Sequence, residues 1–148
     1  MGHDTIIIAC ENCHAKNRIP VSRIGESPRC GKCGTPLPMT TLGRVLTVTD
    51  ASFDRDVMGS GLPVLLDFWA PWCGHCQAMA PVLDGLAGKY AGRVRIAKLN
   101  LDENPATGSR FAVTSVPPLI LVKNGQVRQT LLGAVPVEQV EAAIGNLI

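Results

Sequence analysis

The chain has 148 residues, a formal net charge of +2 and a hydrophobic share of 46%. This length suits one domain, or one domain with a small module, and the composition is ordinary for a globular protein. No apolar run approaches the ~20 residues of a membrane-spanning helix, and the small excess of positive charge would attract nucleic acid only weakly. We therefore expect the protein to bind neither a membrane nor nucleic acid.

Six cysteines form three Cys-x-x-Cys pairs: Cys10 with Cys13, Cys30 with Cys33, and Cys73 with Cys76. The apolar run at residues 6–8 is too short for a signal-peptide core and follows no basic segment, so we expect a cytoplasmic protein. Because that compartment keeps thiols reduced, the pairs are expected to bind metal or to carry out redox chemistry rather than to form structural disulfides.

The first two pairs predict a zinc ribbon. Sixteen residues separate Cys13 from Cys30, a spacing typical of four-cysteine zinc sites. Residues 1–34 contain no aromatic side chain, and so small a module cannot bury enough surface to fold alone. We expect one structural zinc ion on Cys10, Cys13, Cys30 and Cys33, with His14 as an alternative ligand.

A connector follows at Pro36-Leu37-Pro38 and residues 39–41, where proline stiffens the chain. We therefore expect a zinc-ribbon module at residues 1–40 and a second domain at residues 41–148. The ribbon has a few positive charges but no aromatic side chain on which a base could stack, which again argues against nucleic acid.

The second domain alternates strand-like and helix-like segments. Strands are expected at residues 45–49, 64–68, 94–101, 119–123 and 127–132, and helices at 50–60, 73–90, 104–111 and from 136. The apolar run 64–68 is typical of a central strand that is buried on both faces. Asp50 and Asn104 are expected to begin helices, and Asn124-Gly125 predicts a type I′ hairpin. The fold class is α/β, with a mixed central sheet and helices on both faces.

The third cysteine pair opens the long helix. Its two sulfurs should lie on one face of the first helical turn, where unpaired amide groups and the helix dipole stabilise a thiolate. Cys73 is therefore expected to be the nucleophile, and Cys76 to attack the resulting mixed disulfide. A half zinc site is the alternative, but four other cysteines already complete one such site.

The segment around this pair resembles the active site of thioredoxins, and further motifs keep the thioredoxin order from about residue 45 to the end. They are Asp67-Phe68-Trp69-Ala70-Pro71-Trp72-Cys73-Gly74-His75-Cys76, Ala80-Pro81, Ala97-Lys98-Leu99-Asn100, Val116-Pro117, Lys123-Asn124-Gly125 and Gly133-Ala134. With its ribbon, the chain resembles the zinc-binding thioredoxin-2 kind found in bacteria. The resemblance implies the thioredoxin fold and a protein thiol-disulfide oxidoreductase that acts on disulfide-containing proteins and is supplied by an NADPH-dependent reductase.

The resemblance also implies roles for the neighbours of the pair. Asp67 would be the buried carboxylate beneath the disulfide, and burial in its strand would independently raise its pKa, unless it faces water at the strand end. Lys98 would lie near that carboxylate, although a plain surface lysine is an alternative. Pro117 would be the family's cis-proline, and the substrate would contact Trp72, Val116, Gly133 and Ala134. Trp69 is expected to support the core.

Two residues depart from the family pattern. His75 stands where most thioredoxins have proline, and Cys73-Gly74-His75-Cys76 resembles the motif of protein disulfide isomerases. A charged His75 would favour the Cys73 thiolate and raise the reduction potential, whereas a neutral, solvent-facing His75 would not. Pro118 replaces the family's usual threonine and removes a backbone donor. A zinc-regulated redox-sensing or chaperone module remains the competing function.

Overall fold

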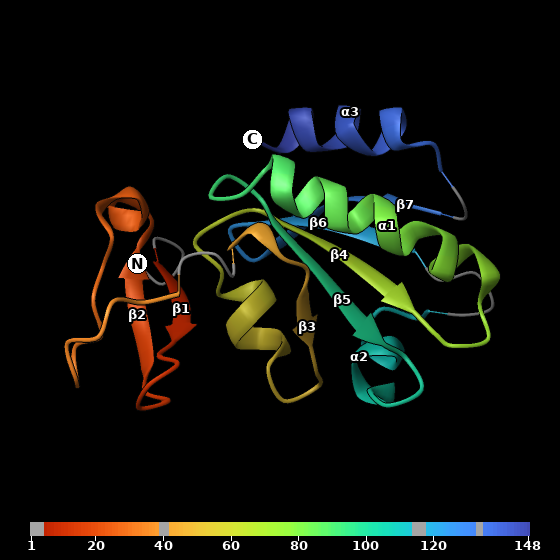
Figure 1. Ribbon diagram of the computed structural model, residues 1–148. Helices are drawn as coiled ribbons and strands as arrows, with labels where there is room; N and C mark the ends of the chain where they lie inside the picture. The colour runs from red at the N-terminus through yellow and green to blue at the C-terminus, as the bar shows by residue number, and fades with distance from the viewer. Residues whose placement is uncertain (1–4, 39–41, 114–117, 133–134) are drawn as a thin grey trace.

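Two sheets organise the computed structural model, which describes residues 5–38, 42–113, 118–132 and 135–148. A two-stranded antiparallel sheet lies in the N-terminal part of the chain, and a five-stranded mixed sheet forms the larger part (Figure 1). No helix within the described ranges is both long and apolar enough to cross a membrane.

The N-terminal sheet is a hairpin of β1 (Thr5–Ala9) and β2 (Lys16–Pro20). A 3-10 helix, η2 (Val21–Glu26), follows it, and an isolated antiparallel bridge joins Arg29 to Pro36. Alternation along β1 turns Ile6 and Ile8 inward. The turn after β1 and the turn inside the Arg29–Pro36 bridge each contain one cysteine pair.

The large sheet has the strand order β3-β5-β4-β6-β7. Its members are β3 (Leu46–Val48), β4 (Val64–Trp69), β5 (Arg95–Asn100), β6 (Leu119–Lys123) and β7 (Gln126–Leu131). The first three run parallel, and β6 and β7 run antiparallel to their neighbours. Asn124 and Gly125 both have positive φ, at 53° and 74°, as a type I′ hairpin requires. The expected mixed sheet and its hairpin are confirmed.

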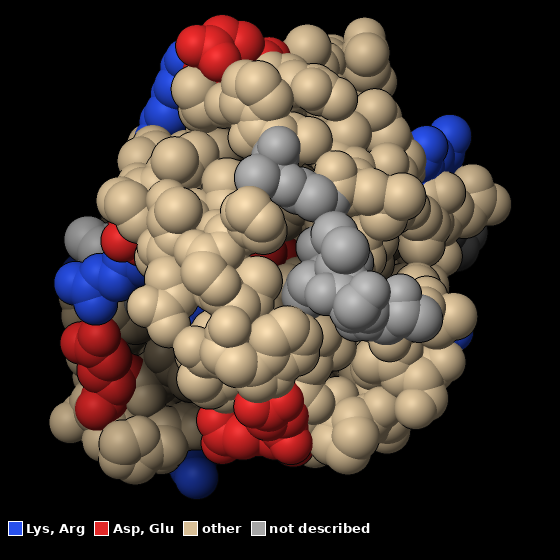
Figure 2. Space-filling model, turned by 90° about the vertical axis from the view of Figure 1, so that its right-hand side faces the viewer, with Lys and Arg blue, Asp and Glu red and all other residues tan. Residues whose placement is uncertain are grey.

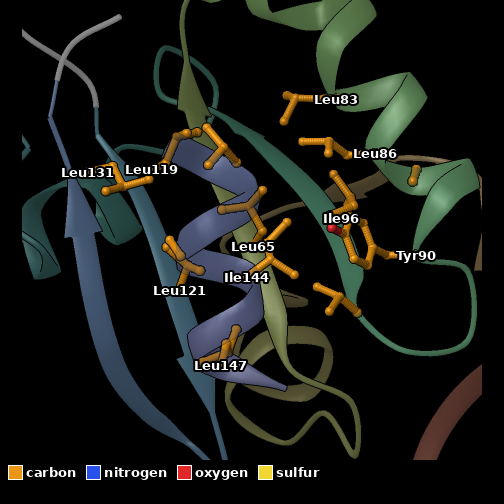
Figure 3. Packing of buried hydrophobic residues seen from close by; sticks show 14 residues of the cluster. Leu65, Leu83, Leu86, Tyr90, Ile96, Leu119, Leu121, Leu131, Ile144 and Leu147 are labelled. Atoms are coloured by element: carbon orange, nitrogen blue, oxygen red, sulfur yellow. The ribbon is translucent and has the colours of Figure 1, made fainter. Parts of the chain in front are cut away.

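Helices cover both faces of this sheet, as the α/β pattern predicted. On one face α1 (Gly74–Lys89) and α3 (Val137–Leu147) pack Leu83, Leu86 and Ile144 against Leu65 and Ile96 (Figure 3). The other face is covered by the π-helical segment η4 (Asp54–Met58) and by residues next to the short helix α2 (Pro105–Arg110). The central strand β4 is therefore buried on both sides, with Val64, Leu65, Leu66 and Phe68 fully inaccessible.

The caps of two helices differ from the prediction. Asp50 does not begin its own helix: its carboxylate accepts hydrogen bonds from the Ala106 and Thr107 amides, at 3.2 and 2.9 Å, and so caps α2. Asn104 precedes α2 as expected but makes no side-chain cap; its Oδ1 accepts from the Asp50 amide at 2.8 Å. The hydrogen bond from the Thr107 hydroxyl, with those from the Thr107 and Ala106 amides, lowers the pKa of Asp50.

The ribbon buries its apolar side against the large domain. Ile6, Ile8 and Ile19 join one hydrophobic cluster with Leu42 and Leu62, which flank the large sheet's first strands. The Gly61 amide donates to the Thr5 carbonyl at 2.6 Å, and a Cβ at Gly61 would lie 2.5 Å from the Thr5 nitrogen. Only glycine permits so close an approach of the two backbones. Packing against the large domain thus adds to the stability that a bound metal ion could give the ribbon.

Candidate functional site

The junction between β4 and α1 positions the third cysteine pair. After β4 ends at Trp69, the Cys73 amide bonds to the Ala70 carbonyl at 3.1 Å and the helix begins at Gly74. Cys73 is the N-cap, with extended φ and ψ of −95° and 110°, and its Sγ accepts the Cys76 amide at 3.2 Å. That amide has no partner within the helix, so the Cys73 sulfur lies in the positive field of the helix start.

Cys76 lies one turn further along and is held differently. Its Sγ is 3.9 Å from the Phe68 carbonyl oxygen, and the residue is 8% exposed. Burial, followed by the hydrogen bond with Cys73, raises the pKa of Cys76 to about 12. The two sulfurs are thus chemically unequal: one faces helix amides, and the other remains a thiol until a base removes its proton.

Asp67 lies beneath the pair, in the middle of the sheet. It is 6% exposed, and desolvation raises its pKa to about 7, although the charge of Lys98 opposes the shift. The carboxylate therefore does not face water at a strand end, which was the alternative expectation. Asp67 and Cys76 both line a cavity of about 270 Å³, so the proton acceptor and the buried thiol share one space.

Lys98 also lines this cavity, opposite Asp67 in the register of β4 with β5. Its Nζ lies 5.6 Å from the centre of the Trp69 ring, a distance typical of a cation–π contact. Trp69 in turn packs against the cluster of Ala70, Cys73 and Cys76, which agrees with its expected supporting role. Lys98 therefore lies in the wall of the cavity that Asp67 and Cys76 also line.

The surface around the pair is formed by exposed side chains. Trp72 is 62% exposed, and its Nε1 donates to Asp102 Oδ1 at 3.2 Å. Gly74 and His75 are exposed as well, and a Cβ at Gly74 would meet no atom within 4 Å. Figure 2, seen from the side where β4 ends and α1 begins, shows mainly uncharged side chains with charged ones toward the margins. Val116, Pro117, Gly133 and Ala134 lie outside the described residues.

Two residues near the pair escaped the sequence analysis. Asp102 anchors Trp72, and the Gln77 side chain donates to the Pro71 carbonyl at 2.8 Å and so fastens the turn before Cys73. A signal for Asp102 existed: it lies two residues after the end of β5, whose carboxyl end meets the same sheet edge as that of the parallel strand β4. Gln77 carried no comparable signal.

The other four cysteines converge as a metal site requires. Their sulfurs all lie within 4.8 Å of one another, with Cys10 and Cys33 at 3.6 Å and Cys13 and Cys30 at 3.6 Å. Tetrahedral zinc with bonds of ~2.3 Å places its sulfur ligands about 3.8 Å apart, so the arrangement fits zinc. Within the described ranges no other group of three metal-ligating side chains comes together.

The two halves of this site repeat one backbone pattern. The amides of His14 and Gly34 bond to the carbonyls of Cys10 and Cys30, each at 2.9 Å, and both residues have positive φ, at 64° and 78°. His14 therefore occupies the turn position that Gly34 occupies in the other half, and it is not a member of the four-sulfur group. The alternative ligand set with His14 is not supported.

The environment of these sulfurs favours a bound cation. Hydrogen bonds from Thr35 and from the Asn12 side chain lower the pKa of Cys33 to about 5. Although the backbone of Ala15 opposes the change, burial and the neighbouring sulfurs raise the pKa of Cys13 to about 11. Four thiolates this close repel one another unless a cation lies between them, and zinc would supply that charge.

Comparison with known proteins gives a family match for each of the two parts of the chain. Residues 44–146 match the family model described as thioredoxin, and residues 9–35 match the model described as thioredoxin 2, N-terminal. A thioredoxin of Haemophilus influenzae is 52% identical over 107 residues, which cover 72% of this chain and all of the relative. Thioredoxins of Synechocystis and Alicyclobacillus acidocaldarius are 53% and 48% identical, over 60% and 70% of this chain and 83% and 97% of the relatives. The chain therefore belongs to the thioredoxin family, and it carries the amino-terminal zinc-ribbon domain of the thioredoxin-2 kind.

Proposed function

We propose that this protein-disulfide reductase uses Cys73 as its attacking thiolate and Cys76 as its resolving thiol. The observation that carries the proposal is the position of Cys73 Sγ at the start of α1, where it accepts the Cys76 amide at 3.2 Å. A sulfur that receives an otherwise unpaired helix amide is stabilised as an anion, which is the reactive form of cysteine.

The reaction begins when the Cys73 thiolate attacks one sulfur of a substrate disulfide. A bond forms between Cys73 and that sulfur, the substrate S–S bond breaks, and the second substrate sulfur leaves as a thiolate. Cys76 then attacks Cys73 Sγ, so that the Cys73–Cys76 disulfide forms and the first substrate sulfur is released. Two electrons pass from the dithiol to the substrate.

The second step needs a base, because burial keeps Cys76 protonated. Asp67 is the candidate, since it shares a cavity with Cys76 and its pKa of about 7 lets it accept a proton near neutral pH. The proton can later reach the departing substrate thiolate through water in that cavity. Lys98, also in the cavity wall, would limit how far the pKa of Asp67 rises.

For substrate binding we propose the exposed ring of Trp72, together with the family positions Val116, Pro117, Gly133 and Ala134. Trp72 is fixed by Asp102, so it offers a preorganised apolar surface beside Cys73.

For the chain as a whole, we propose a domain boundary near residue 40 and a structural zinc ion on Cys10, Cys13, Cys30 and Cys33. We also propose that the protein works in a reducing compartment such as the cytoplasm and receives its electrons from an NADPH-dependent thioredoxin reductase. The four-sulfur geometry supports the zinc ion and, because its thiols must stay reduced, the compartment.

Replacing Cys73 tests the central proposal. In an assay that couples insulin reduction to NADPH through a bacterial thioredoxin reductase, Cys73→Ser should reduce turnover to background, because a serine hydroxyl is not a nucleophile at neutral pH. Cys76→Ser should instead accumulate a mixed disulfide with the substrate, visible on a non-reducing gel. Ala78→Ser, exposed on the same helix, is the control, and retained turnover in Cys73→Ser would refute the assignment.

The raised pKa of Asp67 predicts a pH-dependent gain in stability for Asp67→Asn. The folded state binds this proton more tightly than the unfolded chain, so folding stability falls as pH rises from about 4 to about 7 and then levels off. The rise in the pKa of Asp67 from 3.8 to about 7 sets an upper limit of ~4 kcal/mol on the gain in unfolding free energy at about pH 8. At about pH 4, where the carboxyl group is protonated in the folded state, almost no gain is expected. Urea denaturation of the reduced protein measures both. Asp84→Asn, an exposed carboxylate in the wall of the same cavity, should change little; equal effects from both variants would contradict the assignment.

We propose that His75 raises the reduction potential. Thioredoxin and protein disulfide isomerase differ by ~90 mV, on the order of 4 kcal/mol for two electrons, and we expect His75→Pro to lower the potential by part of that amount. His75→Gln, which removes the charge without adding a proline ring, should lower it as well if the imidazolium is responsible. Equilibration in glutathione buffers measures all three potentials, and an unchanged value in both variants would disprove the role.

The ribbon should bind one zinc ion per chain. Cys33→Ser should lower zinc content and the melting temperature, because the ribbon loses a ligand that supports its fold. His14→Asn should retain the zinc, since asparagine tolerates the positive φ and His14 is outside the sulfur group. Metal analysis and thermal unfolding test this. Zinc release by mild peroxide that also altered reductase activity would instead favour the zinc-regulated sensing function.

A further inference from the structure

A cleft lies between the ribbon and the large domain. It consists of two adjoining cavities, an inner one of about 380 Å³ and an outer one of about 350 Å³, each many times the roughly 15 Å³ that one water needs. The outer cavity reaches Ala9 and Glu11, which flank Cys10, whereas neither cavity is lined by Cys73 or Cys76. Both cavities share the walls formed by Ile7 of β1, Leu46 of β3, Arg55 and Asp56 of η4, and Arg95 of β5. The cleft is thus bounded by β1 of the ribbon and by β3, η4 and β5 of the large domain.

Arg95 is the residue at the centre of this cleft. It is 8% exposed, and its Nε has no hydrogen-bond partner among the described residues. Burial lowers the pKa of Arg95, and the charge of Asp56 only partly compensates. A buried guanidinium nitrogen without an acceptor is unfavourable, and the described residues supply none to Nε, so an acceptor from outside the described residues is expected there.

The two carboxylates that line the inner cavity, Asp54 and Asp56, bond to arginines other than Arg95. Asp56 accepts two hydrogen bonds from Arg55, at 3.1 and 3.3 Å, and Asp54 accepts one from Arg110 at 2.8 Å. Neither makes an ion pair with Arg95.

Further donors remain on the ribbon side. Arg18 of β2 lines the inner cavity and donates to the Thr5 hydroxyl at 3.2 Å, while Lys16 and Glu11 line the outer cavity with charges that cancel each other. With the paired groups set aside, two guanidinium groups from different modules, those of Arg18 and Arg95, face the cleft. Guanidinium groups offer forked donors that match the oxygens of carboxylates and phosphates.

We propose that this cleft binds a small oxyanion, a carboxylate or a phosphate group, with Arg95 as its main ligand and Arg18 as a second. The bound anion would join β2 of the ribbon to β5 of the large domain and so fasten the two modules together. Arg95 pairs with Val64 at one end of β4, whereas the redox pair follows Trp69 at the other end. Five residues at ~3.3 Å each separate these ends by about 16 Å, so the anion would not block the thiols.

Titration of the zinc-loaded, 15N-labelled full chain with sodium phosphate, at constant ionic strength maintained with sodium chloride, tests the proposal. The Arg95 Nε–Hε signal and the backbone amides of Ile7 and Gly59, which line the cleft, should shift saturably with phosphate. A parallel titration with acetate separates the two anion classes: tighter binding of phosphate points to a phosphorylated ligand, and comparable binding points to a carboxylate.

Arg95→Met should weaken phosphate binding at least about tenfold, as measured at the Ile7 and Gly59 amides, because a charge-assisted hydrogen bond is lost. The variant should fold, and its melting temperature without phosphate should be unchanged or higher, since a buried unpaired charge is removed. Arg18→Met should weaken binding less, and the exposed Arg128→Met should not weaken it. Shifts that rise linearly with phosphate, or that persist unchanged in Arg95→Met, would overturn the proposal.

Discussion

The hydrogen bond from the Cys76 amide to Cys73 Sγ depends on how β4 meets α1, and the proposed chemistry rests on that bond. The strand is buried on both faces, so its end is held firmly by the sheet. Two further bonds, from the Cys73 amide to Ala70 and from the Gln77 side chain to Pro71, shape the turn between strand and helix. A sulfur placed there receives the field of the helix start.

Burial sets the pKa values of the other two ionisable groups of the site, Cys76 and Asp67. The same desolvation that raises the pKa of Cys76 to about 12 raises that of Asp67 to about 7, because burial deprives the ionised form of each group of its hydrating water. Keeping the Asp67 carboxylate inside the sheet lowers the folding stability at neutral pH and above, and such a cost is common at the active sites of enzymes. Lys98, held against Trp69 at the cavity wall, moderates this cost.

The ribbon is stabilised in two ways. Its four cysteine sulfurs are arranged for a metal ion, and its isoleucines pack on Leu42 and Leu62 of the large domain. The close approach at Gly61 allows the two backbones to share a hydrogen bond. A small module that lacks aromatic side chains can therefore fold because both the metal site and the docking surface replace a core of its own.

Local spacing and short-range conformation were enough to predict the order of the strands along the chain, the Asn124-Gly125 hairpin, the position of Cys73 and Cys76 at a helix start, and the four-cysteine site. Other features became visible only in the folded molecule: Asp50 caps a helix more than fifty residues away, Asp102 anchors Trp72, and the buried Arg95 Nε has no acceptor among the described residues. These features join residues that are distant in the chain. Their partners are set by the register of parallel strands and by the docking of the ribbon, which no local pattern encodes.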